Sequence, residues 1–412
     1  KENGRFILNF RYEFGNEADL RYNYAADVLD YLGTEDMTNE EIKQQFYKLA
    51  CDYSIRVGDR NINVILRGLG ENMGEALALL ENVMQNAEPD ADVFEMAIQM
   101  LEKSRLDAKH NQRQNFNALV QYGIYGQYNP TRNIISTNDL RDMCPMDLLD
   151  LIRDLKNYKH TVLYYGPMSE KEMAAVVTAN HPTNAELKDV PQGKPYIMQP
   201  TPENEVLIAP YNAKNIYMRM IHNEMRPWNP EEAAVTALFN EYYGGGMNTI
   251  VFQEMREARG LAYNAYAAYV EPTYKDQPEY FFTHIITQND KMIDCITHFH
   301  EILDDMPASE QAFAIAKDAL TKRLASQRTT KFGLINAYLF AKLKGIDYDI
   351  NERIYNALPN LTLDDIVKFE KENIANKTYR YVILGDEHDL DMKALKKFGN
   401  IKKVSTKEIF GY

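Results

Sequence analysis

An arginine and a tyrosine seven residues apart, Arg256 and Tyr263, are the side chains of this sequence best suited to chemistry. A guanidinium and a phenol can both donate hydrogen bonds to a carbonyl oxygen on which negative charge develops. Each such donor contributes about 3–4 kcal/mol of transition-state stabilisation. The planar fork of an arginine also suits the backbone and carboxylate groups of a peptide. The spacing alone favours the alternative, in which Arg256 is a surface helix residue and Tyr263 a strand aromatic.

The residues around this pair predict a tight turn that holds the two side chains close together. Gly244, Gly245 and Gly246 favour a loop, because each glycine costs about 1 kcal/mol inside a helix. Helical spacing follows and stops at Gly260, where a left-handed cap is easiest, and residues 261–266 then have the pattern of a strand. The three glycines are either a simple turn between helices or a place where a peptide backbone approaches closely.

The composition restricts the classes of protein to consider. The chain has 412 residues, 45% of them hydrophobic and 26% charged, which is globular composition with room for two or three domains. The net charge of −14 argues against a nucleic-acid or anionic-membrane surface, since both need clustered positive charge. Apolar runs of about 18 residues, which a membrane span needs, do not occur in the sequence. The chain starts at Lys1 without a methionine or a signal peptide, so we expect a fragment or a processed product.

The order of predicted elements occurs twice. Residues 6–10 resemble residues 217–221, and residues 26–31 resemble residues 237–242, about 210 positions later. The strand pattern at 160–165, which precedes a glycine, is likewise repeated at 379–384. A duplicated unit of about 200 residues therefore accounts for the length of the chain.

A proline-rich segment separates the two copies. The prolines between residues 182 and 204 are Pro182, Pro191, Pro195, Pro200 and Pro202. We predict an α+β fold of two tandem duplicated αβ domains, each a mainly antiparallel sheet covered by helices. The predicted ranges are 1–185 for the first domain, 186–204 for the linker, and 205–412 for the second domain with the glycine loop and the Arg/Tyr pair.

The stretch from the glycine loop through Phe252 to Tyr263 is similar to the second domain of the pitrilysin/insulinase-type (M16) zinc metallopeptidases. Residues 379–384 with Gly385 resemble the end of the same unit, and residues 122–130 resemble the corresponding part of the first. The resemblance covers essentially the whole chain. It implies a family architecture in which two αβ units form one half, and two halves close around an unfolded peptide.

The resemblance also implies where zinc would bind. The family's His-x-x-Glu-His motif belongs on the first helix of the first domain, and alignment on Gly33 places residues 24–28 on it. Both histidines are missing, Asp27 stands at the base position, and Val28 cannot bind a metal. Glu102 lies near the place of the family's third ligand, but one carboxylate does not make a site. We therefore expect no metal site and no cofactor in this chain, and zinc in a missing N-terminal half.

Other chemistries find little support. His298 and His300 are two positions apart on a predicted helix and point in different directions, so a solvated helix face is favoured over a metal site. Cys295 is expected to be a small buried residue, and the three cysteines include no CxxC pair. His284 is expected on a sheet surface. A GxSxG nucleophile motif is missing, and the triple glycine lacks the Lys and Ser/Thr of a phosphate-binding loop.

The resemblance implies that the chain is the C-terminal, non-zinc half of a metalloendopeptidase and is inactive alone. It would complete the peptide chamber and supply Arg256 and Tyr263 to a zinc site in an N-terminal half, covalently joined or a separate subunit. The acidic balance would favour basic or neutral peptides. Two alternatives remain: a separate non-catalytic partner subunit, or a peptide-binding or structural assembly protein without proteolysis. Large bacterial relatives are often exported, which favours the periplasm.

Overall fold

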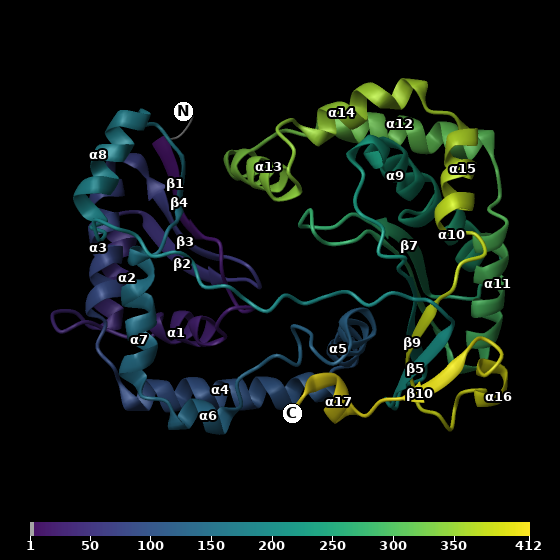
Figure 1. Ribbon diagram of the computed structural model, residues 1–412, viewed down its shortest axis with the longest axis horizontal. Coiled ribbons are helices and arrows are strands. Elements are labelled where there is room, and N and C mark those ends of the chain that lie inside the picture. Colours follow the sequence, from purple (N-terminus) through teal and green to yellow (C-terminus); the bar gives the residue numbers. More distant parts are fainter. Residues whose placement is uncertain (1–3) are drawn as a thin grey trace. The chain divides into compact units, whose positions relative to one another are not determined.

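The computed structural model describes residues 4–412, apart from the side chains at positions 331 and 332 (Figure 1). The chain divides into two compact units. The first contains the residues up to Asp107, then Ile134–Tyr196 and Thr330–Ile335; the second contains Ala108–Asn133, Ile197–Thr329 and Asn336–Tyr412. Within the described range, the helices are all too short or too polar to cross a membrane.

The first unit is built on a four-stranded antiparallel sheet in the order β2-β3-β1-β4. Its strands are β1 (Arg5–Tyr12), β2 (Cys51–Val57), β3 (Ile62–Leu69) and β4 (Thr161–Tyr165). The helices of this unit are α1 (Arg21–Leu29), α2 (Asn39–Lys48), α3 (Met73–Asn86), most of α4 (Ala91–His110), α6 (Thr137–Asp142), α7 (Pro145–Asp154) and α8 (Glu170–Asn180).

Alternating burial explains the first sheet. Along β3, Ile62, Val64 and Leu66 are fully buried while the residues between them are half-buried, as period-2 patterning requires. The helix α2 begins at a capping box: Thr38 accepts from the amide of Glu41, and the Glu41 carboxylate accepts from the amide of Thr38.

The second unit contains a six-stranded sheet in the order β10-β5-β9-β6-β8-β7. The strands are β5 (Glu205–Ala209), β6 (Asn215–His222), β7 (Asn264–Val270), β8 (Tyr280–Gln288), β9 (Arg380–Leu384) and β10 (Asn400–Lys403). The pairs β10-β5 and β5-β9 are parallel, and the others are antiparallel. The predicted α+β class with mainly antiparallel sheets is confirmed.

Helices cover both faces of this second sheet (Figure 1). The larger core lies between one face and the helices α9 (Ala233–Phe239), α11 (Met292–Asp304), α12 (Glu310–Ser326), α14 (Ile350–Ala357) and α15 (Leu363–Asn373). The opposite face packs against α5 (Gln112–Tyr125) and α17 (Thr406–Phe410). The remaining helices of this unit include α13 (Lys331–Lys344), part of which counts with the first unit, and α16 (Met392–Leu395).

The helix α5 belongs to the second unit, although the predicted range 1–185 includes it. Its apolar residues Phe116, Leu119 and Val120 share a core with strands of the second sheet. Gly123 lies so close to β9 that an added Cβ would be 2.8 Å from a methyl group of Val382. The division of the chain therefore follows the packing of α5 and not the duplication.

The proline-rich segment is extended and held at two positions along its length. The Lys194 amide donates to the Glu17 carbonyl at 2.8 Å within the first unit. The Gln199 amide donates to the Ile124 carbonyl at 2.7 Å within the second. The predicted linker is thus held by main-chain hydrogen bonds, although it has no helix or strand of its own from 189 to 204.

Candidate functional site

The stretch from Asn240 to Val270 forms two π-helical turns around the glycines and ends in an edge strand. The π-helix η5 (Asn240–Gly244) is followed by the exposed Gly245 and Gly246, by α10 (Ile250–Phe252) and by a second π-helix, η6 (Gln253–Ala258). The strand β7 then begins at Asn264. The predicted order of helix, glycine loop, short helix, glycine stop and strand is correct, and the π geometry is additional. Single π-turns inside helices are frequent at functional sites.

Main-chain hydrogen bonds close the turn between η6 and β7. The amides of Leu261 and Ala262 both donate to the Met255 carbonyl, at 2.9 and 3.3 Å. Gly260 donates to the Arg256 carbonyl at 3.0 Å and has a φ of +56°, the left-handed conformation predicted for a glycine cap. The Met255 side chain is fully buried, so the turn is attached to the core.

The far side of the turn is held by the neighbouring strand and helix. The Leu261 carbonyl accepts from the Thr287 hydroxyl at 2.6 Å and from the Cys295 thiol at 3.2 Å. Burial raises the pKa of Cys295 to about 11, so the thiol keeps its proton at neutral pH and remains a donor. The amide of Tyr263 donates to the Ile286 carbonyl at 2.9 Å. Cys295 is buried, as predicted, and supports the turn.

This frame brings Arg256 and Tyr263 together and leaves both side chains exposed. The Arg256 guanidinium carbon lies 5.8 Å from the centre of the Tyr263 ring and 5.1 Å from that of Phe252. Tyr263 is 76% exposed, and the carboxylate nearest to Arg256 is that of Glu257, at 3.9 Å. Both side chains can therefore present their hydrogen-bond donors to a ligand.

The three predicted glycines have different surroundings. Gly244 is buried, and an added Cβ would lie 1.9 Å from the Ala267 carbonyl oxygen, so this position brings η5 against β7. Gly245 and Gly246 are exposed, with no atom closer than 3.9 Å to an added Cβ. Only these two present accessible backbone.

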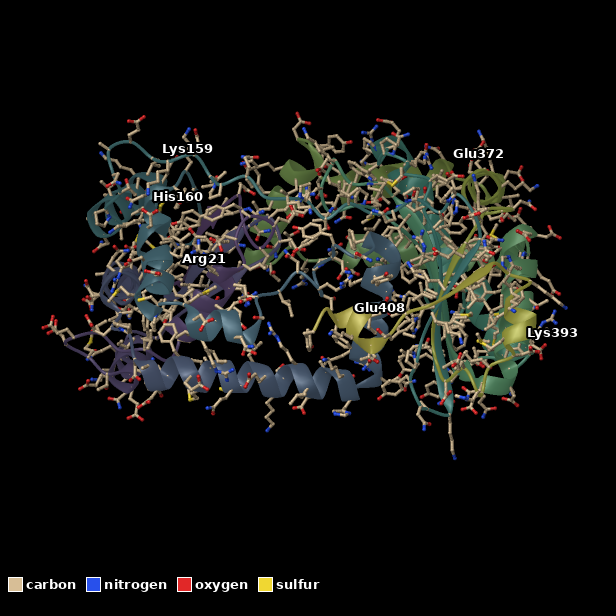
Figure 2. All side chains as sticks on the ribbon, turned by 60° about the horizontal axis from the view of Figure 1, so that its bottom comes forward. Arg21, Lys159, His160, Glu372, Lys393 and Glu408 are labelled. Atoms are coloured by element: carbon tan, nitrogen blue, oxygen red, sulfur yellow. The ribbon has the colours of Figure 1, made fainter. Side chains whose placement is uncertain are left out.

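The residues aligned with the zinc motif do not fit a metal. They lie on α1, whose first residue is Arg21 (Figure 2). Ala25 and Val28 are buried in the apolar core of the first unit, and Asp27 is exposed. Glu102 is bound by both terminal nitrogens of Arg141, at 2.8 and 3.0 Å. Among the described residues, three or more His, Cys, Asp or Glu side chains do not gather anywhere in a metal-binding group.

The histidine pair on α11 diverges, as its spacing predicts. Nδ1 of His298 contacts the Glu301 carboxylate at 2.7 Å, whereas Nε2 of His300 contacts the Tyr381 hydroxyl at 2.5 Å. Both histidines are bound within the fold. The predicted solvated face is wrong for His298, which is only 5% exposed.

One cluster of polar side chains on the second sheet was not predicted from the sequence. Arg219 lies at the centre of the second sheet, on β6, opposite His284 of β8, which is in turn opposite Tyr266 of β7. His284 was expected on the surface of a sheet, and it does lie on a strand. Its side chain is buried, however, with only 8% exposed. An arginine between Tyr217 and Ile221, on the apolar side of a strand, is the signal that would have found it.

Comparisons with known proteins agree with this fold. Residues 155–320 match the model of the peptidase M16 inactive domain. A crystal structure of a peptidase M16 inactive domain from Pseudomonas fluorescens superposes with a TM-score of 0.71 at 17% identity, over 94% of this chain and 93% of that one. Curated protein sequences give no match.

Two longer proteases contain the same fold over part of their length. The periplasmic protease PqqL from Escherichia coli has a TM-score of 0.72 at 14% identity, over 94% of this chain and 43% of its own. The ferredoxin protease FusC, solved in complex with Arabidopsis ferredoxin, has a TM-score of 0.74 at 11% identity, over 93% of this chain and 42% of its own. The chain thus spans less than half of each protease.

Residues 155–320 match the peptidase M16 inactive domain, and the whole chain has the fold of such a domain. The resemblance to the C-terminal half of this family is confirmed. An inactive domain of this kind implies a catalytic half as its partner.

Proposed function

We propose that this chain closes the peptide chamber of an M16-type zinc metalloendopeptidase and supplies Arg256 and Tyr263 to a zinc site in an N-terminal half. The observation that carries the proposal is the convergence of these two exposed donors on one fixed turn, with 5.8 Å between guanidinium and ring. Exposed side chains on a backbone held this firmly are arranged for a ligand and contribute little to the core.

The reaction served would be the hydrolysis of internal peptide bonds. Because α1 offers no set of zinc ligands, this chain would contribute only the hydrogen-bond donors of Arg256 and Tyr263 to the reaction. The phenol and guanidinium would donate hydrogen bonds to the carbonyl under attack, where negative charge grows. The exposed backbone at Gly245 and Gly246 would allow an extended peptide to pass close by.

Kinetics of the enzyme assembled with its N-terminal half test this role. Arg256→Ala and Tyr263→Phe should each lower kcat/KM for peptides at least tenfold, and by up to about a thousandfold where the donor acts only in the transition state. Arg113→Ala and Tyr355→Phe, exposed residues on α5 and α14, should leave kcat/KM unchanged. Equal kinetics for the wild type and both site variants would refute the proposed roles.

The alternatives differ in what this chain joins. A separate, non-catalytic partner subunit is compatible with the coverage of the Pseudomonas fluorescens chain, 93% of which this chain matches. A peptide-binding or assembly protein without proteolysis would bind peptides but show no dependence of hydrolysis on Arg256. The kinetic series distinguishes the assembly protein from the two proteolytic arrangements.

A further inference from the structure

On the α5 side of the second sheet, Arg219 is a cation without a counter-charge. Within residues 4–412, carboxylates are all farther than 4.0 Å from its guanidinium. Its contacts are instead aromatic: the guanidinium carbon is 4.4 Å from the centre of the Phe282 ring and 5.9 Å from that of Phe116. Stacking on ring faces fixes the plane of an arginine and leaves its edge for hydrogen bonding.

The hydrogen bonding of this cluster is incomplete. One terminal nitrogen of Arg219 donates to the Tyr266 hydroxyl at 3.4 Å, a long contact, and Nε is buried without a partner. Directly opposite on β8, Nδ1 of His284 is also buried without a partner. A buried donor that is left unsatisfied destabilises the fold, and an oxygen ligand that accepts from it would offset this cost.

A second arginine on the same face shows what a satisfied site looks like. Arg380 of β9 binds the Glu205 carboxylate at 2.8 Å, the Gly123 carbonyl at 2.7 Å and the Pro200 carbonyl at 3.1 Å. Arg380 therefore has internal acceptors for all three of its nitrogens. Arg219 is paired with Val382, two positions along β9 from Arg380, and its Nε has no such acceptor.

We propose that Arg219, framed by Tyr266, Phe282 and His284, binds a single peptide carboxylate on the second sheet. A planar carboxylate matches the guanidinium fork, and the surrounding rings suit the apolar part of a peptide. Burial and the charge of Arg219 lower the pKa of His284 to about 4, so its imidazole is neutral at pH 7 and can donate one proton. The net charge of −14 disfavours polyanions, so a single carboxylate on an otherwise neutral or basic peptide fits best.

This inference takes its ligand class from the proposed peptide chamber, but its test needs neither the zinc half nor hydrolysis. The probes are short peptides with an uncharged fluorophore at the N-terminus and no charged group other than the carboxylate under test. One ends in a free carboxylate, one in an amide, and one in an amide with an internal aspartate. Fluorescence anisotropy with the complete 412-residue chain gives the three dissociation constants.

The wild-type chain should bind the free-acid peptide about tenfold or more tightly than the amide, as a charged hydrogen bond predicts. Tighter binding of the aspartate peptide than of the free acid would assign the site to side-chain carboxylates, and the reverse order would assign it to the C-terminus. Arg219→Gln should abolish the discrimination, and Arg219→Lys should keep part of it. Arg113→Gln, an exposed arginine on α5, should keep all of it.

Thermal unfolding of each variant shows whether it folds. Even if Arg219→Gln does not fold, the comparison of the acid and amide peptides in the wild type still tests whether the chain recognises a carboxylate. Equal binding of all three peptides would overturn the carboxylate site and leave the chamber proposal standing. Discrimination that survives in a folded Arg219→Gln chain would also overturn it. A chain that binds no peptide would overturn it as well, while the role of Arg256 would still be decided by kcat/KM.

Discussion

Two segments of this chain, α1 and the stretch from η6 to Tyr263, use their side chains in opposite ways. On α1, Val28 occupies the second histidine position of the aligned metal motif and is buried in the core of the first unit. Arg256, on η6, and Tyr263, in the turn after it, are exposed and make no strong internal contact. In both segments the backbone is firmly held. The comparison teaches that a firmly held backbone can turn its side chains into the core, as α1 does at Val28, or toward solvent, as the turn does at Tyr263.

The largest expected effect concerns the glycine that attaches the turn to its sheet. Gly244→Val should destabilise the chain by more than about 3 kcal/mol, because its side chain would overlap the Ala267 carbonyl. Gly245→Ala should change the free energy of unfolding by less than about 0.5 kcal/mol, since its surroundings are open. Chemical denaturation measures both. Similar effects at the two positions would contradict the packing role of Gly244.

A second variant tests whether α1 has become part of the core. Val28→His returns a histidine to the metal-motif position, but it places a polar ring where the valine is 2% exposed. We expect a loss of about 2–3 kcal/mol in the free energy of unfolding, with no recovery on adding zinc. Stabilisation of this variant by zinc would show that α1 retains the geometry of a metal site.

A smaller effect is expected behind the turn. Thr287→Val removes the hydroxyl that donates to the Leu261 carbonyl at 2.6 Å and should cost about 1 kcal/mol of stability. Because Thr287 positions the turn, Thr287→Val should also lower the kcat of the assembled enzyme more than it raises the KM. Thr297→Val is a suitable control, since that hydroxyl bonds only within its own exposed helix turn. Equal kcat for both variants would mean that the Leu261 contact does not position the pair.

The smallest effect is expected at the acid of the degenerate motif. Asp27→Asn should change the free energy of unfolding by less than about 0.5 kcal/mol and should leave kcat/KM unchanged. Asp27 is exposed, and α1 has no histidine beside it that could bind a metal. A tenfold fall in kcat/KM would reveal a catalytic function in α1 and would remove the contrast between the two segments.

Local patterns carried much of this structure. The Thr38–Glu41 capping box and the glycine stop at Gly260 specify neighbours within a few positions, and the sequence alone indicates both. The alternation that begins at Arg5 indicates a half-buried strand, whereas β1 is buried on both faces. Contacts between distant positions were not readable. The alignment of Arg219, His284 and Tyr266 across three strands depends on strand register. That α5 belongs to the second unit depends on its packing against a sheet whose strands come much later in the chain.

The chain passes between its two units more than once, and this affects how the protein can be divided. A cut in the extended segment near Tyr196 would leave the units joined through α4, and again through the return of the chain after Asn133. A gene fragment ending at residue 196 would carry α5 away from the sheet it covers, and one starting at 197 would expose Val382 and Leu207. Neither piece is a self-contained domain. Insertion, deletion or recombination at the proline-rich segment would therefore be poorly tolerated, and the two copies are expected to be inherited together.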